Sequence, residues 1–133
     1  MVPVEENFQK LVAQLDYPMF IATVATDKER AGCLIGFATQ CSIHPARFLA
    51  GISDKNHTHR VAQRAGAMGI HLVPEGVPLV ADCPNRFVGR ILERVDFGDH
   101  TGMVLEPIFA EVEGSDDQLS FHRAKRIDPG HEA

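Results

Sequence analysis

Hydrophobic and polar residues follow a helical period in two segments of the chain. Apolar residues recur at helical spacing between positions 4 and 15, and two glutamates lie in the first turn of this segment. We therefore expect an amphipathic N-terminal helix over about 4–15, ended by the sequence Asp16-Tyr17-Pro18. A second, short helix is expected over 56–67, with Asn56 or Thr58 capping its N-terminus.

Elsewhere the chain consists of short apolar, partly β-branched runs separated by turn residues, a pattern typical of strands. The runs 87–97 and 103–112 are joined through Phe97-Gly98-Asp99-His100 and are expected to form a hairpin. Gly36 and Gly51 are predicted to mark places where another group approaches the backbone closely. Because no long helices alternate with the runs, the pattern predicts a mainly β fold, a small β-barrel with short helices at its ends. The other expected strands are 19–25, 33–41, 48–52, 69–73 and 119–122.

Length and composition limit the domain organisation. The chain has 133 residues, of which 44% are hydrophobic and 23% charged, and this predicts a single domain over 1–133. A chain of this size excludes an enzyme with a catalytic domain and a separate substrate domain. The polar tail over about 124–133 is expected to be flexible.

Charge and targeting signals predict the compartment and argue against some partners. The formal net charge is −5 and no basic block is present, which argues against nucleic-acid binding. The N-terminus lacks the basic start and apolar stretch of a signal peptide, and no apolar run approaches the ~18 residues of a membrane span. We therefore expect a cytoplasmic protein that does not bind membranes.

Cysteines and histidines do not form a recognisable metal or disulfide pattern. Cys33 and Cys41 lie in a segment expected to be extended, where ~3.3 Å per residue would place them about 26 Å apart. The seven histidines include His57 and His59, but no further ligands follow at a metal-binding spacing. We therefore expect neither a disulfide nor a bound metal.

The clearest candidate chemistry lies where an expected strand passes into the short helix. Ser53, Lys55, Asn56 and Thr58 place two hydroxyls, an amide and a cation at this junction. A helix N-terminus attracts phosphate, and Lys55 would add a positive charge. The alternative is that these residues only cap the helix, beside a solvated lysine. Every strand-to-helix turn needs a cap, so the junction taken by itself favours this alternative.

The segment before this junction is uncharged and suits contact with a flat heterocycle. Thr39, Gln40 and Ser42 offer polar groups, while Gly36 and Ala38 allow close approach. No standard glycine-rich nucleotide motif, phosphate-binding loop or nucleophile elbow is present. The chemistry therefore has to come from these two neighbouring segments.

Three motifs together resemble the flavin reductase-like, FMN-binding split-barrel family, and small actinobacterial members in particular. They are Gly-Phe-Ala-Thr-Gln-Cys-Ser-Ile-His-Pro at 36–45, Ser-Asp-Lys-Asn-His-Thr at 53–58 and Gly98-Asp99-His100. The resemblance covers roughly 17–112 together with 119–122. It implies a split barrel of Greek-key type.

The resemblance also implies a cofactor site and an activity. The implied reaction is hydride transfer from NADH or NADPH to FMN, with FAD also possible. The implied assembly is a homodimer that holds the flavin near the subunit interface, with a monooxygenase as a possible partner. Asp99 and His100 would lie on the nicotinamide side as catalytic residues, although they could equally form only a hairpin turn. The residues implied to bind the cofactor are Ala38, Thr39, Gln40, Cys41, Ser53, Lys55, Asn56 and Thr58. Cys41 would lie near the flavin, but we expect it to act mainly as a small buried hydrophobic residue.

Two departures from the family pattern leave other functions open. The connection over 74–86 is short where family members usually have a helix and a loop that cover the flavin, and Gly36, Phe37 and Ala38 replace a frequent Ser-Ser-Phe. The short connection favours a non-catalytic FMN-binding protein, an electron carrier or flavin store. A third possibility is a barrel that binds another planar cofactor, such as haem or deazaflavin. Because Lys55 and Thr58 are expected at an exposed junction, replacing either by Ala should weaken FMN retention without unfolding.

Overall fold

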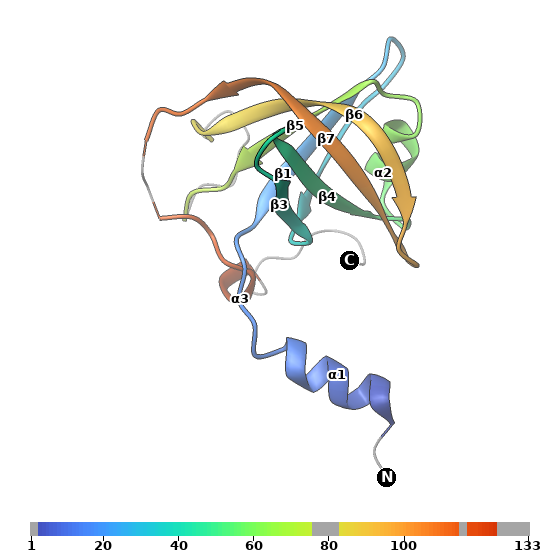
Figure 1. Ribbon diagram of the computed structural model, residues 1–133, viewed down its shortest axis with the longest axis vertical. Helices are drawn as coiled ribbons and strands as arrows, with labels where there is room; N and C mark the ends of the chain where they lie inside the picture. Colours follow the sequence, from blue (N-terminus) through green and yellow to red (C-terminus); the bar gives the residue numbers. More distant parts are fainter. Residues whose placement is uncertain (1–2, 76–82, 115–116, 125–133) are drawn as a thin grey trace.

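Seven antiparallel strands form one sheet that curls into a barrel in the computed structural model (Figure 1), which describes residues 3–75, 83–114 and 117–124. The order across the sheet is β2-β1-β5-β6-β7-β4-β3, so β2 and β3 are its edge strands. The strands are β1 (Phe20–Ala25), β2 (Arg30–Ile35), β3 (Ala38–Ser42), β4 (Arg47–Ser53), β5 (Ala67–Leu72), β6 (Arg86–Asp96) and β7 (His100–Glu111).

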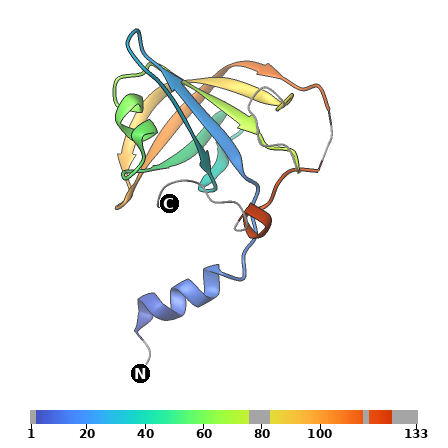
Figure 2. The same ribbon diagram turned by 180° about the vertical axis from the view of Figure 1, so that it is seen from behind.

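The barrel interior is filled by residues that alternate along the strands. Ala22, Ile52, Ile70, Met103 and Leu105 are completely buried there. Helix α2 (His57–Ala62) covers one end of the barrel, where it packs mainly against β1 and β2 (Figure 2). The mainly β barrel predicted from the sequence is therefore confirmed, as is the hairpin of β6 and β7.

The two predicted helices are present but shorter than expected. Helix α1 covers Val4–Val12, since the chain forms a turn directly after it, and none of its residues is buried. Helix α2 begins after Asn56 as predicted and ends at Ala62. In Figures 1 and 2, α1 projects away from the barrel.

The expectation of one strand over 33–41 is wrong. The chain leaves the sheet at Gly36 and Phe37, so the segment forms the end of β2 and nearly all of β3, at opposite edges of the sheet. A Cβ atom at Gly36 would lie 2.7 Å from Tyr17 Cε2, which shows that the crossing is packed tightly against Tyr17. Cys33 is buried and Cys41 exposed, and both are free thiols.

The expected last strand over 119–122 is also wrong. The segment makes only isolated bridges, between Ser120 and Pro18 and between Gln118 and Pro74, before the short helix α3 (Phe121–Ala124). These single pairings satisfy the backbone where the apolar run suggested a longer ladder. Residues 125–133 of the expected flexible tail lie outside the described residues.

Candidate functional site

The turn between β4 and α2 is ordered by its own side chains. Asn56 Oδ1 accepts a hydrogen bond from the backbone N–H of Thr58 at 2.9 Å, which confirms Asn56 as the cap of α2. Ser53 Oγ accepts one from the Lys55 N–H at 3.3 Å, and the Asn56 N–H donates to Ser53 O at 3.1 Å. Two of the predicted phosphate ligands therefore also hold the shape of the turn.

Thr58 does not lie at an exposed junction, contrary to expectation. It is only 1% exposed, because the first turn of α2 packs against β2. There the Cys33 thiol hydrogen-bonds with the side chains of Thr58 and Asn56, while burial raises the pKa of the thiol. Cys33, which the sequence analysis considered only as a possible disulfide partner, thus connects β2 to the cap of α2.

The turn between β6 and β7 lies directly beside this junction. His100 is paired with Ser53 across β4 and β7, and the Asp54 N–H donates to Asp99 O at 2.9 Å. His100 Nδ1 lies 2.8 Å from Asp99 Oδ1. This hydrogen bond, followed by the charges of His100 and Lys55, lowers the pKa of Asp99.

Both interpretations of Asp99 and His100 agree with this geometry. The backbone of Asp99 orders the hairpin, whose Gly98 has φ +128°, a conformation that favours glycine. The carboxylate of Asp99 meanwhile fixes one nitrogen of the His100 ring. The structure therefore brings Ser53, Lys55, Asp99 and His100 into one cluster.

Strand β3 extends away from this cluster along an edge of the sheet. It pairs with β4 and, within the described residues, with no other strand. Ala38 lies opposite Ala50, three residues from Ser53 along β4, or about 10 Å at ~3.3 Å per residue. Thr39, Gln40 and Cys41 are exposed, so the expectation that Cys41 is buried is wrong. The exposed edge leaves backbone and side-chain groups accessible to a flat ligand.

A row of aromatic rings next to the cluster was missed by the sequence analysis. The Phe37 ring centroid lies 4.7 Å from that of His100 and 6.2 Å from that of Tyr17, and Tyr17 stacks on Phe121 at 4.7 Å. The sequence feature that pointed to this row is the pair Gly36 and Gly51, where close approaches were predicted. A Cβ atom at Gly51 would lie 3.0 Å from Phe37 O. The close approaches predicted at Gly36 and Gly51 are thus confirmed, and both involve this aromatic row.

Comparison with known proteins gives a family for this arrangement. Residues 12–77, which include β3 and the turn between β4 and α2, match the family model described as "Flavin reductase like domain". This chain belongs to the flavin reductase-like family. No curated protein matches this flavin reductase-like chain.

Solved structures share the fold of this flavin reductase-like protein at low sequence identity. The NADH:FAD oxidoreductase SgcE6 of Streptomyces globisporus has 16% identity and a TM-score of 0.78, with 91% of each chain covered. The styrene monooxygenase flavin reductase of Pseudomonas putida S12 has 16% identity and a TM-score of 0.75, covering 86% of this chain and 92% of that chain. The FMN-binding protein of Thermus thermophilus has 18% identity and a TM-score of 0.72, covering 81% and 82%. The predicted split-barrel fold is confirmed.

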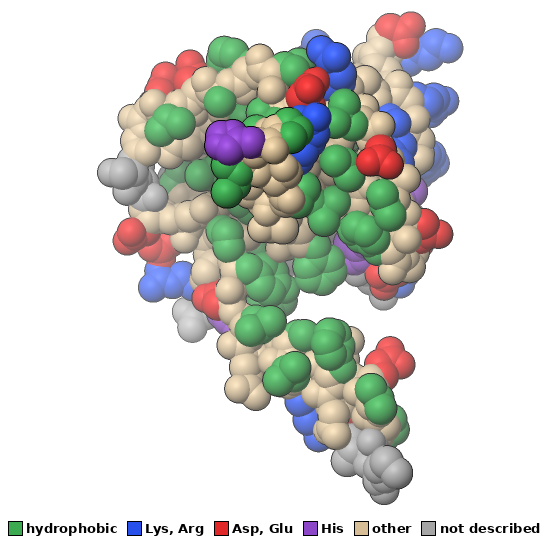
Figure 3. Space-filling view, viewed as in Figure 1, with side chains coloured by type: hydrophobic (Ala, Val, Ile, Leu, Met, Phe, Trp, Pro, Cys, Tyr) green, Lys and Arg blue, Asp and Glu red, His purple; other side chains and the backbone are tan. Residues whose placement is uncertain are grey.

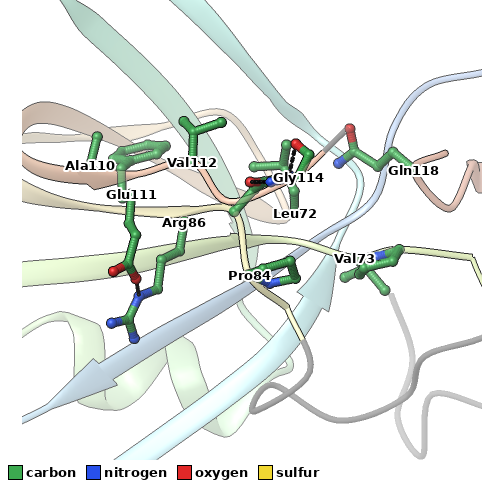
Figure 4. Close-up of a pocket in the computed structure, with 12 residues that line it drawn as sticks. Leu72, Val73, Pro84, Arg86, Ala110, Glu111, Val112, Gly114 and Gln118 are labelled. Carbon is green, nitrogen blue, oxygen red and sulfur yellow. Dashed lines mark hydrogen bonds and ion pairs between the residues drawn. The ribbon is translucent and has the colours of Figure 1, made fainter. Parts of the chain in front are cut away.

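Two cavities of the flavin reductase-like barrel lie apart from the cluster. One of about 380 Å³ is lined by residues of β5, β6 and β7 together with Val112, Gly114 and Gln118, and the ion pair of Arg86 and Glu111 lies on its wall (Figure 4). It is at the far end of β7 from His100, roughly 35 Å away at ~3.3 Å per residue. The other, about 720 Å³, is a groove that includes Thr23, Gly69 and His71. No predicted site residue lines either cavity.

The described part of the flavin reductase-like chain offers neither a cluster of metal ligands nor a membrane-spanning helix. Within residues 3–75, 83–114 and 117–124, no three His, Cys, Asp or Glu side chains are grouped so that they could hold a metal ion. None of the helices in these ranges is long and apolar enough to cross a membrane.

Proposed function

We propose that this protein is a flavin reductase that binds FMN or FAD and transfers hydride to it from NADH or NADPH. The observation that carries the proposal is that the β3 edge, the β4–α2 turn and the β6–β7 turn meet along one side of the barrel. The family match spans the first two of these segments.

The residues divide into those that would contact the flavin phosphate and those that shape its site. Lys55 is exposed, and its ammonium group would bind the phosphate. Ser53, Asn56 and Thr58 are buried, and their printed hydrogen bonds hold the turn together. We therefore assign them mainly to positioning Lys55 and the backbone of the turn.

The flat part of the cofactor would lie along β3. Backbone groups of 38–41, with the side chains of Thr39 and Gln40, are the proposed hydrogen-bonding partners of the ring edge. The Gln40 side chain already donates to Ser42 O at 3.2 Å, so it is preoriented along the strand. When bound, the flavin supplies the hydride chemistry, with N5 as the acceptor.

Asp99 and His100 would orient the nicotinamide and manage protons. Asp99 fixes His100 through Nδ1, which leaves Nε2 as the ring nitrogen available for a ligand. Packing against Phe37 further restricts the imidazole ring, whose side chain is 14% exposed. A histidine held on two sides in this way can present one nitrogen at a fixed position.

Partners follow from the same proposal. One structural neighbour is the flavin reductase of a styrene monooxygenase, which supports reduced flavin being passed to a partner oxygenase. We also propose a homodimer, because α1 exposes apolar residues that one copy of the chain does not cover, including Phe8 at 54% and Leu11 at 60%. The second subunit would complete the flavin site.

A non-catalytic FMN-binding protein remains the second candidate. Only 13 residues connect Leu72 of β5 to Arg86 of β6, so little chain is available to cover a bound nicotinamide. The similar fold of the Thermus thermophilus FMN-binding protein also fits this candidate. Such a protein would bind flavin and leave NADH and NADPH unoxidised.

Titration of the purified protein with flavins and NAD(P)H tests the proposal. We expect FMN or FAD to bind and to be reduced by NADH or NADPH, followed as the loss of absorbance of the reduced nucleotide. Binding without oxidation of either nucleotide would contradict the reductase and support the second candidate. The absence of flavin binding would contradict both candidates.

Lys55→Ala tests the phosphate contact separately. Loss of a charged hydrogen bond, about 1.5–3 kcal/mol, should weaken FMN binding by roughly ten- to a hundredfold. Riboflavin, which has no phosphate, should bind Lys55→Ala and the wild type equally. Arg60→Ala removes another exposed cation from α2 and serves as the control. An equal loss of riboflavin affinity in Lys55→Ala would show that Lys55 does not contact the phosphate.

A further inference from the structure

The ring of Phe37 is half exposed on the outer face of the sheet. The residue lies in the crossing between β2 and β3 and is 56% accessible to solvent. The Gly51 N–H donates to Phe37 O at 2.6 Å, and a Cβ atom at Gly51 would lie 3.1 Å from Phe37 Cβ. The side chain of Phe37 therefore leaves the sheet on the side to which Gly51 faces. Since Ala50 and Ile52 fill the barrel interior, this side is the outer face.

The strand register places several of the proposed flavin contacts on this same face. Side chains two residues apart along a strand point to one side, so Ser53 shares the face of Gly51 and Thr39 that of Phe37. Ser53 is paired with His100 across β4 and β7, and the ring centroids of His100 and Phe37 are 4.7 Å apart. Phe37 thus lies between the β3 edge, where the flavin ring is proposed to bind, and His100.

The neighbours of Phe37 hold its ring in place. The ring packs on His100 at an angle of 50° and lies beside Tyr17 at a centroid distance of 6.2 Å. Tyr17 is itself stacked on Phe121, with an angle of 25° between the rings. These contacts come from β7 and from the segment before β1, and they leave the rest of the Phe37 ring open to solvent. A ligand therefore meets a positioned aromatic surface rather than a loose loop.

The polar groups assigned to the flavin leave the faces of its ring without a partner. Backbone groups of 38–41, with Thr39 and Gln40, can bond only the edge of the ring, and Lys55 is assigned to the phosphate. The isoalloxazine is a flat aromatic system, and such rings pack favourably on aromatic side chains in offset or tilted arrangements. Phe37 supplies an exposed aromatic surface at the position where the ring is expected, so its chemistry fits the group.

We propose that the exposed side of Phe37 packs against the isoalloxazine ring. The contact rests on the proposed function and adds to it a source of affinity that does not depend on the tail of the flavin. FMN, FAD and riboflavin share the ring, whereas riboflavin lacks the phosphate assigned to Lys55. Replacing an aromatic side chain that stacks on a base by Ala lowers affinity roughly five- to a hundredfold. Phe37→Ala should cause a loss in this range, and the loss should be equal for every ligand that contains the ring.

Titration with FMN, riboflavin and lumiflavin tests the contact, because lumiflavin keeps the ring and lacks both the ribityl chain and the phosphate. Phe37→Ala should lose the same factor for all three ligands, while Lys55→Ala should weaken FMN alone. Phe109→Ala is the matched control, since Phe109 is 50% exposed near the far end of β7 from His100, and it should leave all three affinities unchanged. A Phe37→Ala variant that binds riboflavin and lumiflavin as the wild type does would overturn the proposal.

Phe37→Trp supplies a second readout that does not depend on affinity. The chain contains no tryptophan, and an indole ring in contact with a flavin strongly quenches the fluorescence of the flavin. The fluorescence lifetime of bound FMN should therefore be shorter in Phe37→Trp than in the wild type, while Phe109→Trp should leave it unchanged. An unchanged lifetime in Phe37→Trp would contradict the contact. Flavin binding and reduction by the wild type would still stand in that case, so the two proposals fail separately.

Discussion

Among the polar residues of the barrel, His71 on β5 combines burial with an incomplete set of hydrogen bonds. It is 7% exposed, and its Nε2 lies 3.1 Å from Thr23 Oγ1. Its Nδ1 is buried and has no hydrogen-bond partner among the described residues. Burial lowers the pKa of His71, and the charge of Arg86 lowers it further. Folding therefore favours the neutral form of this imidazole.

This burial predicts a loss of stability on acidification. Below the ordinary histidine pKa of 6.5 the unfolded chain binds a proton at His71, while the folded chain does so only at lower pH. The free energy of unfolding should therefore fall as the pH drops from about 6.5 toward the lowered folded-state pKa. Urea unfolding of the wild type and His71→Asn between pH 7.5 and 5.5 measures this, and the variant should show the shallower dependence.

His44→Gln supplies the control for the pH experiment, because His44 is exposed in the turn between β3 and β4. It should retain the pH dependence of the wild type. Identical slopes in His71→Asn and the wild type would mean that other groups cause the acid sensitivity.

At the scale of elements, α2 depends on tertiary contacts at both ends. A helix of six residues is too short to be stable alone. Asn56 caps its start, and Arg94 on β6 donates to Ala62 O at 3.3 and 2.9 Å and to Ala65 O at 2.6 Å after its end. These bonds satisfy carbonyl groups that the end of the helix leaves without intrahelical partners.

Arg94→Met should therefore destabilise the protein and loosen the proposed phosphate turn. We expect a loss of roughly 1.5–3 kcal/mol in the free energy of unfolding, since hydrogen bonds from a charged group are removed. Urea denaturation measures this loss, and FMN affinity should fall with it. Arg90→Met, an exposed change on the same strand, should stay within about 0.5 kcal/mol of the wild type. Equal stability of the two variants would show that Arg94 does not hold α2.

The strands that the sequence predicted best are β4, β5 and β6, whose observed bounds lie within two residues of the expected runs. In β4 and β5, where buried apolar residues dominate, the local pattern and the final packing also agree. The crossing at Gly36 was missed because it depends on Tyr17, which lies in a different part of the chain. Thr58 was misplaced for the same reason, since its burial comes from β2 and Cys33.

The candidate site was predicted in its parts but not in its geometry. The motifs indicated the β3 edge, the β4–α2 turn and Asp99-His100 separately, while their meeting depends on the pairing of β4 with β7. That pairing is a long-range contact with no local signal in the sequence. Phe37 was noted only as a departure from a related pattern, because its contact with His100 also forms across the fold.

For the whole molecule, the position of α1 is the feature that one copy of the chain does not explain. Val4 is 85% exposed, Phe8 54% and Leu11 60%, and the helix has nine residues. Figure 3 shows hydrophobic side chains along one side of α1 and on the barrel face turned the same way. A helix this short needs its apolar side to be packed in order to be stable. A second copy of the chain, packed against α1 and this face, would cover both surfaces.

We therefore expect the wild type to be a dimer whose stability depends on the apolar side of α1. Phe8→Asp combined with Leu11→Asp should place unpaired charges in the interface and shift the protein toward monomer, measured by light scattering after size-exclusion chromatography. Gln9→Asp combined with Lys10→Asp adds charge elsewhere on the helix and is the control, which should remain dimeric. If the flavin site is completed by the second subunit, the monomeric variant should also bind FMN more weakly although its barrel stays folded. A monomeric wild type, or a Phe8/Leu11 variant that remains dimeric, would show that α1 has another role.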